Sequence, residues 1–462
     1  MKISFKWPIG IASLLMIISG CQWQEEWLDV KRNINDVMPS TLEDCQAILD
    51  EDLTMNRQYP MLAMTCTDNL YIPKEIVNSI SEFERNSYTF AHDIFGVLSH
   101  GDYFNQYVKI EYANIALERL GKIDPSHPGH GQIKGQALFF RAFAHYCLAE
   151  VYGSIYNKAT AATDQGIQLR LTADPNITTP RSSVSETYGQ IISDLNEAVT
   201  LLPEKPAYLT RPSKAAAYAL LAKTYLSMDD YARAAEFAGK SLGIQGNLLD
   251  FNSEVIKPAS TYVFPDTRTG LNPEIILYAV NFAYSSLRPA TSIQFADSTL
   301  YRSYVDNDLR KSLFYREDAQ GRARFTGVYS GNLYNFGGLA VNETLLILAE
   351  CKSRLGQWQE GMEALNRLLG YRFRKETFQP LEAAGQAEAL TLILEERRKE
   401  LPFTGIVRWQ DLRRLNKEPE RAVKVTHISS QGMHELLPGD RKYVFPLPVN
   451  EIALSGVAQN PR

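Results

Sequence analysis

The residues between Glu395 and Arg414 form the densest charge cluster in the chain and include several carboxylates. Two carboxylates held across a cleft could cleave a glycosidic bond by acid and base catalysis. In a helix, however, residues three and four positions apart are neighbours, so Glu396 would lie beside Lys399 and Glu395 beside Arg398. This spacing favours ion pairing, and we expect a structural network here instead of a catalytic pair.

His127 and His130, in the segment DPSHPGHG, have a spacing at which they could bind a metal ion together with Asp124. The proline and glycines mark a turn, and no further ligand cluster lies nearby in the sequence, so we expect two solvated loop histidines. The sequence also lacks a G-x-S-x-G elbow, an H-E-x-x-H helix and a G-x-x-x-x-G-K-[ST] phosphate loop. We therefore predict no enzyme activity, no metal and no cofactor.

Aromatic and polar residues interleave in several loop-like stretches, and this mixture suits sugar binding. A flat aromatic ring can contact the apolar face of a pyranose, while amide, carboxylate and guanidinium groups bind the hydroxyls. Each such residue also has a structural interpretation, in core packing for the rings or in ion pairing for the charges. The ligand contacts that we predict are Asp68, Asn69, Tyr71, Tyr103, Tyr284 and Arg288.

Helices must position these loops, because helical periodicity dominates the chain. Apolar residues from Tyr188 to Leu202 recur at spacings of three and four, and Pro203 ends that pattern. Similar patterns predict three helix pairs, which are 104–120 with 134–152, 184–202 with 213–227, and 340–355 with 359–369.

Two of the helical segments share a repeat. The first copy contains Ala222, Asp229, Tyr231, Ala234 and Ala238, and the second has Ala349, Gly356, Trp358, Gly361 and Leu365 at the same offsets. Small residues allow two helices to approach closely, and the aromatic residue packs over the turn, as in tetratricopeptide units. We predict a helix–turn–helix in each copy.

Long segments without helical rhythm separate the helices, chiefly 152–183, 243–312 and 415–462. Long loops in compact domains usually carry function. The predicted fold is therefore mainly α, with a tetratricopeptide-like scaffold that carries long irregular ligand-binding loops. We expect one domain over 21–462, with helix pairs within about 104–242 and 340–369 and loop-rich parts at about 243–335 and 415–462.

The N-terminal apolar run between Lys6 and Cys21 is too short to span a membrane and follows a basic start. Ser19 and Gly20 before Cys21 resemble a bacterial lipobox, in which the cysteine is acylated after cleavage. We predict a lipoprotein signal peptide at 1–20 and lipidation of Cys21; an ordinary signal peptide is the alternative. The lipid would then hold the mature chain to a membrane.

The composition excludes some partners. The 462 residues are 45% hydrophobic and carry a formal charge of −5, with no long basic block that could follow a phosphate backbone, so we expect no nucleic-acid partner. Cys147 and Cys351 fall in apolar helical patterns, where a thiol acts as a small hydrophobic group. A disulfide between Cys45 and Cys66 is left open.

Several stretches together resemble the SusD/RagB family of surface lipoproteins, which bind nutrients for TonB-dependent transporters in Bacteroidetes. In chain order they are EEWLDVKRNINDVMPSTLEDCQAILD, RAFAHYCLAEVYGSIY, PRSSVSETYGQIISDLNEAVTLLP with SKAAAYALLAKTYLSMDDYARAAEFAGKSL, LILEERRKELPFTGIVRWQDLRRL and KYVFPLPVNEIALSGVAQNP. The sequence departs from the family at Thr404, where a glutamate is usual, and in lacking a Gly-x-Pro after Tyr156.

The resemblance implies a binding protein that captures oligosaccharides at the outer membrane, facing the cell exterior, and delivers them to a SusC-like TonB-dependent transporter. It also implies that the segment around Asp68 and Tyr71 and the start of the helix at Tyr103 lie near the ligand surface. The stretch Gln24-Glu25-Glu26 after Cys21, with its two acidic residues, is similar to the surface-export signals of such lipoproteins. Peptides or glycopeptides are an alternative ligand class, and a surface glycosidase is the alternative function.

Overall fold

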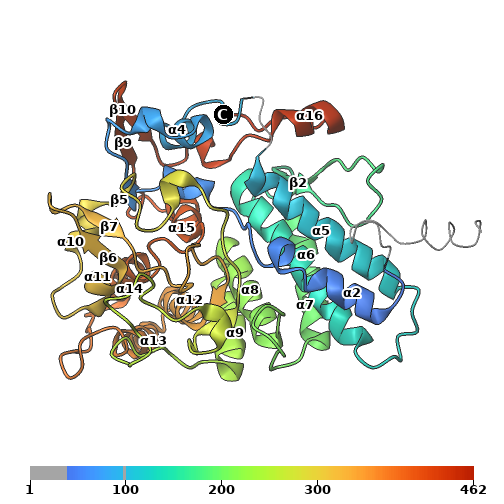
Figure 1. Cartoon of the computed structure of the whole chain (residues 1–462), viewed down its shortest axis with the longest axis horizontal. Coiled ribbons are helices and arrows are strands. Elements are labelled where there is room, and N and C mark those ends of the chain that lie inside the picture. Colours follow the sequence, from blue (N-terminus) through green and yellow to red (C-terminus); the bar gives the residue numbers. More distant parts are fainter. Residues whose placement is uncertain (1–38, 97–99) are drawn as a thin grey trace, which may run out of the picture.

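Paired helices build one half of the molecule, and short strands with long loops build the other (Figure 1). The computed structural model describes residues 39–96 and 100–462. Its helices are α2 Leu42–Leu49, α3 Asp52–Met55, α4 Glu82–Tyr88, α5 Gly101–Leu120, α6 His130–Tyr152, α7 Val184–Leu201, α8 Lys214–Ser227, α9 Tyr231–Ile244, α10 Ser298–Arg302, α11 Leu309–Phe314, α12 Val341–Arg354, α13 Trp358–Leu369, α14 Gln386–Glu400, α15 Val407–Leu415 and α16 Val449–Ser455.

The strands are short and form two-stranded antiparallel sheets. They are β1 Leu70–Tyr71, β2 Gln165–Gln168, β3 Arg181–Ser183, β4 Ile275–Leu277, β5 Phe295–Ala296, β6 Tyr315–Glu317, β7 Ala323–Phe325, β8 Leu339–Ala340, β9 Val425–Ser429 and β10 Gly432–Leu436. The pairs β2–β3, β6–β7 and β9–β10 are local, whereas β1–β5 and β4–β8 join segments far apart in the sequence. These long-range pairs tie the loops to the frame.

The helices form a layered stack, and the predicted mainly α fold is confirmed. Helices α5 and α6 make an antiparallel hairpin, α7 packs against α6, and α8 with α9 continues the stack to α12, α13 and α14 (Figure 1). Local sequence sets where these helices begin. Ser183 and Glu186 form a capping box at the start of α7, and the side chain of Ser213 accepts a hydrogen bond from the first turn of α8.

The predicted repeat is present in the α8–α9 and α12–α13 hairpins. The matched residues Asp229 and Gly356 both have left-handed backbone, with φ of 58° and 83°, so each reverses the chain at the same point of its turn. A Cβ added at Gly361 would lie 2.7 Å from the carbonyl oxygen of Ala349. The small residues in this repeat therefore allow the close helix contact that the sequence predicts.

The charge cluster forms the expected ion-pair network, but most of its partners lie far away in the sequence. The side chain of Glu400 accepts hydrogen bonds from Arg310 and Arg372, and Arg372 also binds Glu274. These side chains are at most 1% exposed. The predicted pair of Lys399 with Glu396 is present at 2.6 Å.

The predicted ion pair between Glu395 and Arg398 is not formed, which corrects the predicted network. Glu395 lies on the exposed face of α14 and has no ion-pair partner among the described residues, because Arg398 turns instead toward Asp68. Helical spacing identified which residues are neighbours, but not which side of the helix faces the core.

The cysteines Cys45, Cys66, Cys147 and Cys351 are buried free thiols. Cys45 and Cys66 lie in two different hydrophobic clusters, so they form no disulfide. Burial raises the pKa of the Cys66 thiol to about 11 and that of Cys147 to about 12. These thiols therefore act as apolar packing groups, as predicted for Cys147 and Cys351.

Lys109 on α5 is a buried cation without a carboxylate in salt-bridge contact among the described residues. Its ammonium lies 4.7 Å from the centre of the Tyr59 ring, and burial lowers its pKa to about 7. The unfolded chain keeps this proton up to about pH 10, so above pH 7 the folded state binds fewer protons. Stability should therefore rise with pH by at most about 1.4 kcal/mol per unit between about pH 7 and 8.5.

The Lys109→Met variant tests this contribution. Denaturant unfolding at about pH 7 and 8.5 should give a smaller rise in stability for Lys109→Met than for the natural chain. The exposed Lys122→Met variant should keep the full rise and serves as the control. An equal rise in all three proteins would contradict the burial of an uncompensated ammonium.

Candidate functional site

A surface groove lies between α5, α16 and the chain that follows β2, at the upper right of Figure 1. Its volume is about 440 Å³. Helix α5 supplies one wall through Phe104, Tyr107 and Glu111, which recur at the spacing of one helical face. We call this feature the α5–α16 groove.

The wall of the groove on α5 is aromatic. The Phe104 ring is 61% exposed, whereas Tyr103 is buried behind it and Tyr107 is half-buried. The Tyr103 and Tyr107 rings are 4.9 Å apart, and their hydroxyls donate hydrogen bonds to the side chain and the main-chain oxygen of Gln168. These bonds fix the two tyrosines, so a fixed aromatic surface lies beside an exposed ring.

Polar groups surround the aromatic wall. Glu111 comes from α5, Arg170 from the chain after β2, and Asn450 and Glu451 from α16. The guanidinium of Arg170 donates to the main-chain oxygen of Asp174, which fixes its direction. The groove therefore offers acceptors and donors next to aromatic faces, an arrangement that can bind an uncharged polyhydroxylated ligand.

Helix α16 is held at its ends. None of its residues is buried, and Leu454 is 86% exposed. Beyond its C-terminus the Asn460 amide donates to the main-chain oxygens of Tyr152 and Phe445, and Arg181 donates to the Asn460 side chain. The flanking chain thus anchors α16 together with Ile452, which packs against the core, and the rest of the helix forms a wall of the groove.

Asn69 lies in the interior, and the half-buried Asp68 beside it belongs to the ion-pair network. Asp68 accepts paired hydrogen bonds from Arg408, and Asn69 is fully buried, with its amide donating to the main-chain oxygen of Pro402. Burial alone would raise the pKa of Asp68, but the guanidinium groups of Arg408 and Arg398 outweigh it and hold that pKa well below its usual range. The burial of Asn69 corrects the surface role that we predicted for it, whereas Asp68 stays a predicted contact whose carboxylate is already paired with arginines.

Tyr284 is likewise internal, at 3% exposure. Its hydroxyl donates to Asp102 at 2.7 Å and lies 2.9 Å from Nε2 of His100. Burial raises the pKa of Asp102 to about 6 and lowers that of His100 to about 3. Asp102 also accepts hydrogen bonds from the main-chain N–H groups of Met61 and Leu62, so it stabilises the chain next to α5.

Tyr71 and Arg288 are the accessible residues of the predicted set, and the buried Tyr103 borders a groove. Tyr103 lines the α5–α16 groove. Tyr71 is half-buried on β1 and stacks on Phe295 of β5 at 5.7 Å, and Arg288 is exposed after a short turn. The six predicted residues therefore do not form one site, because Tyr71 and Arg288 lie outside this groove.

Phe104, Tyr107 and Glu451 line the groove but are not among the six predicted contacts, although the resemblance places the start of the helix at Tyr103 and Phe104 near the ligand surface. The helical periodicity of the sequence does indicate Phe104 and Tyr107. Together with Glu111 they lie on a different helical face from the buried Ile110 and Ala113. Exposed aromatic residues off the core face of a helix indicate a binding surface. Glu451 had no such signal, since the position of α16 depends on distant anchors.

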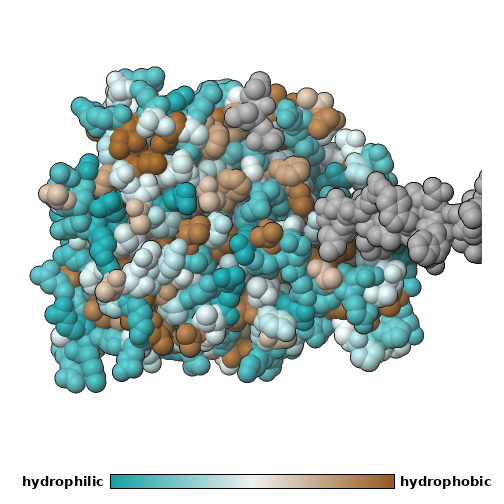
Figure 2. All heavy atoms as spheres, in the orientation of Figure 1, coloured by the Kyte–Doolittle hydropathy of each residue, from teal (hydrophilic) through white to brown (hydrophobic). Residues whose placement is uncertain are grey.

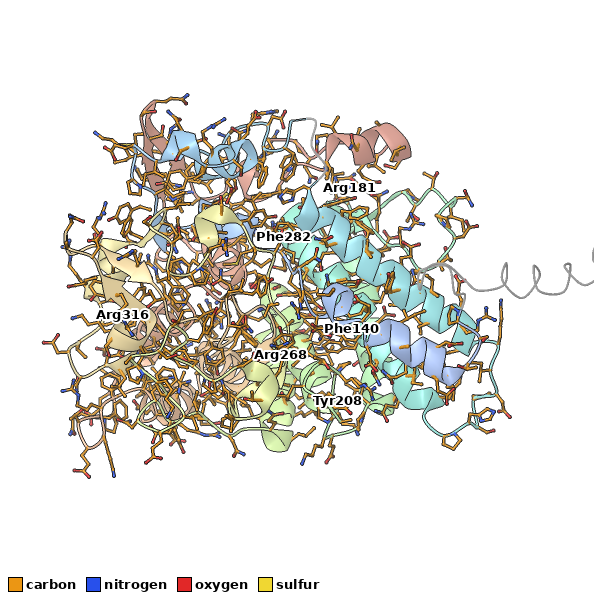
Figure 3. The ribbon with its side chains drawn as sticks, viewed as in Figure 1. Phe140, Arg181, Tyr208, Arg268, Phe282 and Arg316 are labelled. Atoms are coloured by element: carbon orange, nitrogen blue, oxygen red, sulfur yellow. The ribbon has the colours of Figure 1, made fainter. Side chains whose placement is uncertain are left out.

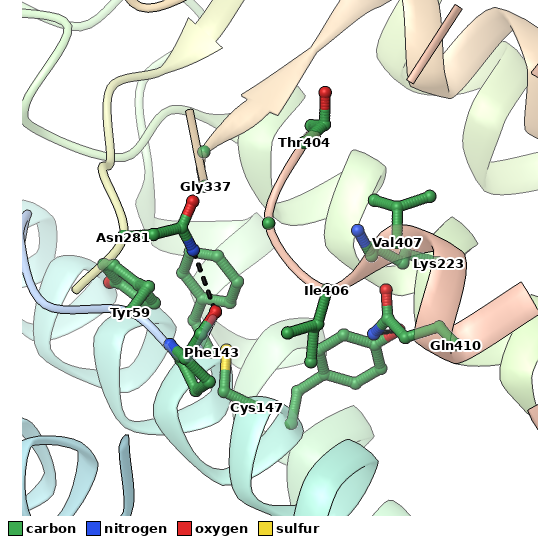
Figure 4. A pocket seen from close by; sticks show the side chains of 14 residues that line it. Tyr59, Phe143, Cys147, Lys223, Asn281, Gly337, Thr404, Ile406, Val407 and Gln410 are labelled. Carbon is green, nitrogen blue, oxygen red and sulfur yellow. Dashed lines mark hydrogen bonds between the residues drawn. The ribbon is translucent and has the colours of Figure 1, made fainter. Parts of the chain in front are cut away.

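A small internal cavity lies among Tyr59, Phe143, Asn281, Ile406 and Gln410 (Figure 4). Its volume is about 30 Å³, which suits a water molecule and not a sugar. The side-chain oxygens of Asn281 and Gln410 have no hydrogen-bond partner among the described residues. A cavity of this size has room for one water molecule, which would supply a donor to these oxygens.

The histidine pair also differs from expectation. His127 is exposed, as predicted, but His130 is the first residue of α6 and is buried, so the prediction of a solvated loop histidine is wrong there. Its Nε2 donates to the main-chain oxygen of Leu120, the last residue of α5, at 3.0 Å. His130 thus satisfies a free carbonyl at a helix end.

Cys21 and the proposed signal peptide lie outside the described residues. Within residues 39–96 and 100–462, none of the helices has both the length and the apolar composition needed to cross a membrane. The surface seen in Figure 2 is mostly polar, with apolar side chains gathered at the corner where α4 and the β9–β10 hairpin lie.

Two family models match the chain. The model described as "Starch-binding associating with outer membrane" matches residues 26–226, and the model described as "SusD family" matches residues 340–462. Among curated proteins, the chain is similar to "SusD-like protein P2" of Formosa agariphila, with 26% identity over 75% of this chain and 76% of that protein.

Solved structures share the fold. A putative sugar-binding protein from Bacteroides vulgatus matches with a TM-score of 0.73 and 20% identity, covering 92% of this chain and 99% of that one. A SusD superfamily protein from Bacteroides thetaiotaomicron matches with a TM-score of 0.72 and 19% identity, covering 91% and 100%. The overall fold therefore has counterparts among solved structures.

Proposed function

The chain belongs to the SusD/RagB family, and from this premise we propose that it is a surface lipoprotein that binds oligosaccharides in the α5–α16 groove. It delivers them unchanged to a SusC-like TonB-dependent transporter in the outer membrane. The single observation that carries the binding part is the aromatic wall of Phe104 and Tyr107 beside the polar groups of α16 and the chain after β2.

The charges of the groove favour a neutral sugar. Glu111 and Glu451 line it together with one cation, Arg170. Carboxylates accept hydrogen bonds from sugar hydroxyls but repel uronic acids and sulfate groups. The groove therefore suits neutral hexose or pentose chains better than acidic ones.

The buried ion-pair network, whose Glu350 lies on α12 outside the α5–α16 groove, is not suited to cleavage. Hydrolysis of a glycosidic bond needs a carboxylic acid and a carboxylate on either side of it. The buried carboxylates of the ion-pair network are held by arginines; for Glu350, burial is outweighed by Arg414 and Arg354, and its pKa falls to about 2. Such a group cannot donate a proton at neutral pH.

A glycan panel tests binding and cleavage together. Calorimetric titration with maltohexaose, cellohexaose, xylohexaose and mannohexaose should give binding for at least one neutral chain and no new reducing ends after incubation. Polygalacturonate and a sulfated glycan should bind more weakly at low salt. New reducing ends from the purified protein would contradict the proposal and favour the glycosidase.

A peptide ligand is the second candidate, and the two carboxylates Glu111 and Glu451 are the observation that favours it. They would attract the amino terminus or a basic side chain of a peptide. Titration with a mixed lysine-containing hexapeptide separates the two ligand classes. Binding of that peptide with no binding of the glycan panel would favour the peptide.

The proposals that the protein lies on the cell surface and passes its ligand to a transporter rest on the predicted lipidation of Cys21 and on the family. Protease treatment of intact cells should degrade the protein while an internal marker survives, and the Cys21→Ala variant should leave the membrane fraction. Affinity purification of the lipidated chain should recover a large outer-membrane transporter. Tyr71 and Arg288 stay predicted contacts outside this groove.

A further inference from the structure

Tyr208 is an exposed aromatic residue on a fixed turn. Its side chain is 65% exposed, so it contributes little to the core. The turn that carries it is well anchored, because the main-chain oxygen of Tyr208 accepts from Arg211 and that of Leu209 accepts from Tyr278. A large ring held in water by a rigid turn is typical of a binding surface.

One face of the Tyr208 ring is occupied by a cation. The guanidinium of Arg211 lies 5.2 Å from the ring centre and donates two hydrogen bonds to the carboxylate of Asp50. This pair fixes the cation, and the cation in turn holds the ring in place. The opposite face of the ring remains available to a ligand.

A second groove lies beside this ring, with a volume of about 500 Å³. Gln245, Asn247 and Asn272 line it. Asn247 is exposed, and the Nδ2 of the buried Asn272 has no hydrogen-bond partner among the described residues. We call this feature the Tyr208 groove.

The Tyr208 groove is electrically balanced. The exposed charges of Glu204 and Lys205 are opposite, and Arg211 is paired with Asp50. The exposed ring and the exposed Asn247 amide, without net charge, match a neutral sugar, whose C–H face packs on the ring while a hydroxyl bonds the amide. The Gln245 amide already donates to the main-chain oxygens of Pro273 and Ile275.

The two grooves lie at different ends of the helical layer. Arg181, which binds Asn460 beyond α16, lies near the top of Figure 3, whereas Tyr208 lies near the bottom, with α5 and α6 between them. The two sets of lining residues do not overlap. One short oligosaccharide therefore fills one groove, and a long chain can contact both.

We propose that the Tyr208 groove is a second binding site for neutral saccharides, which acts with the α5–α16 groove to hold polysaccharides at two points. This inference rests on the proposed saccharide binding at the first groove. Two-point attachment raises the affinity for a polymer far above that of either site, while short oligosaccharides gain nothing from it.

The test compares Tyr208→Ala with Tyr208→Phe and with Tyr262→Ala, a variant of an exposed tyrosine outside both grooves. The probes are the hexasaccharide from the panel that binds the natural chain and its parent polysaccharide. Calorimetry should give two hexasaccharide sites in the natural chain and one in Tyr208→Ala, with the affinity of the remaining site unchanged.

Affinity electrophoresis with the polysaccharide should show that Tyr208→Ala loses about 10-fold or more in affinity, while Tyr208→Phe and Tyr262→Ala match the natural chain. A natural chain with one site that Phe104→Ala removes and Tyr208→Ala leaves intact would overturn the second site and keep the first. A natural chain that binds none of the panel saccharides would overturn both sites.

Discussion

The Glu400→Gln variant should lose about 3–5 kcal/mol of unfolding free energy, the cost of breaking a buried ion pair from one side. Glu400 is the shared acceptor of Arg310 and Arg372 and also binds the amide of Asn342. Glutamine keeps the volume but removes the negative charge that the two buried guanidinium groups share, and it places an amide N–H₂ among these donors. Urea unfolding followed by circular dichroism measures the loss.

Glu395→Gln is the matched control, because Glu395 is on the same helix but faces solvent. It should change the stability by less than about 0.5 kcal/mol. Equal stabilities for Glu400→Gln and Glu395→Gln would mean that the buried network does not hold the loop-rich half to the helical frame.

The Phe104→Ala variant should lower the affinity of the α5–α16 groove for its hexasaccharide by about 10-fold to 100-fold. The ring is the most exposed aromatic group of the groove, and truncation to alanine removes the face on which a pyranose would pack. Because the ring is exposed, its loss should leave the fold intact. Calorimetry with the best ligand of the panel gives the change.

Tyr371→Ala is the control for this change, since Tyr371 is also an exposed aromatic residue and lies outside the groove. It should bind like the natural chain. If Phe104→Ala bound the hexasaccharide as tightly as Tyr371→Ala does, the ligand would have to bind elsewhere on the surface.

The helical frame could be predicted from the sequence because its determinants are local. Apolar spacing predicts the bounds of α7 and α12 closely. The matched turn residues Asp229 and Gly356 predict two hairpins from the sequence alone. Charge spacing on α14 correctly indicated ion pairing. The partners Arg310 and Arg372 were not predictable, because the chain between these segments folds through loops without periodicity.

The site was predictable only in part, for the same reason. Tyr103 was identified as a candidate, and it lines the groove. Asn69 and Tyr284 have the residue types of a sugar site, but long-range contacts bury both. Composition shows which side chains could bind a sugar, whereas burial decides which of them a ligand can reach. Burial in irregular loops depends on distant partners that a single sequence does not reveal.

The central claim is that a neutral oligosaccharide lies against the aromatic wall of α5. A crystal structure of the protein soaked with the hexasaccharide that binds most tightly tests it most directly. We predict a pyranose ring packed on Phe104 and hydroxyls bonded to groups of α16 and of the chain after β2. Uncleaved sugar bound elsewhere at full occupancy, with the α5–α16 groove free of it, would contradict the account.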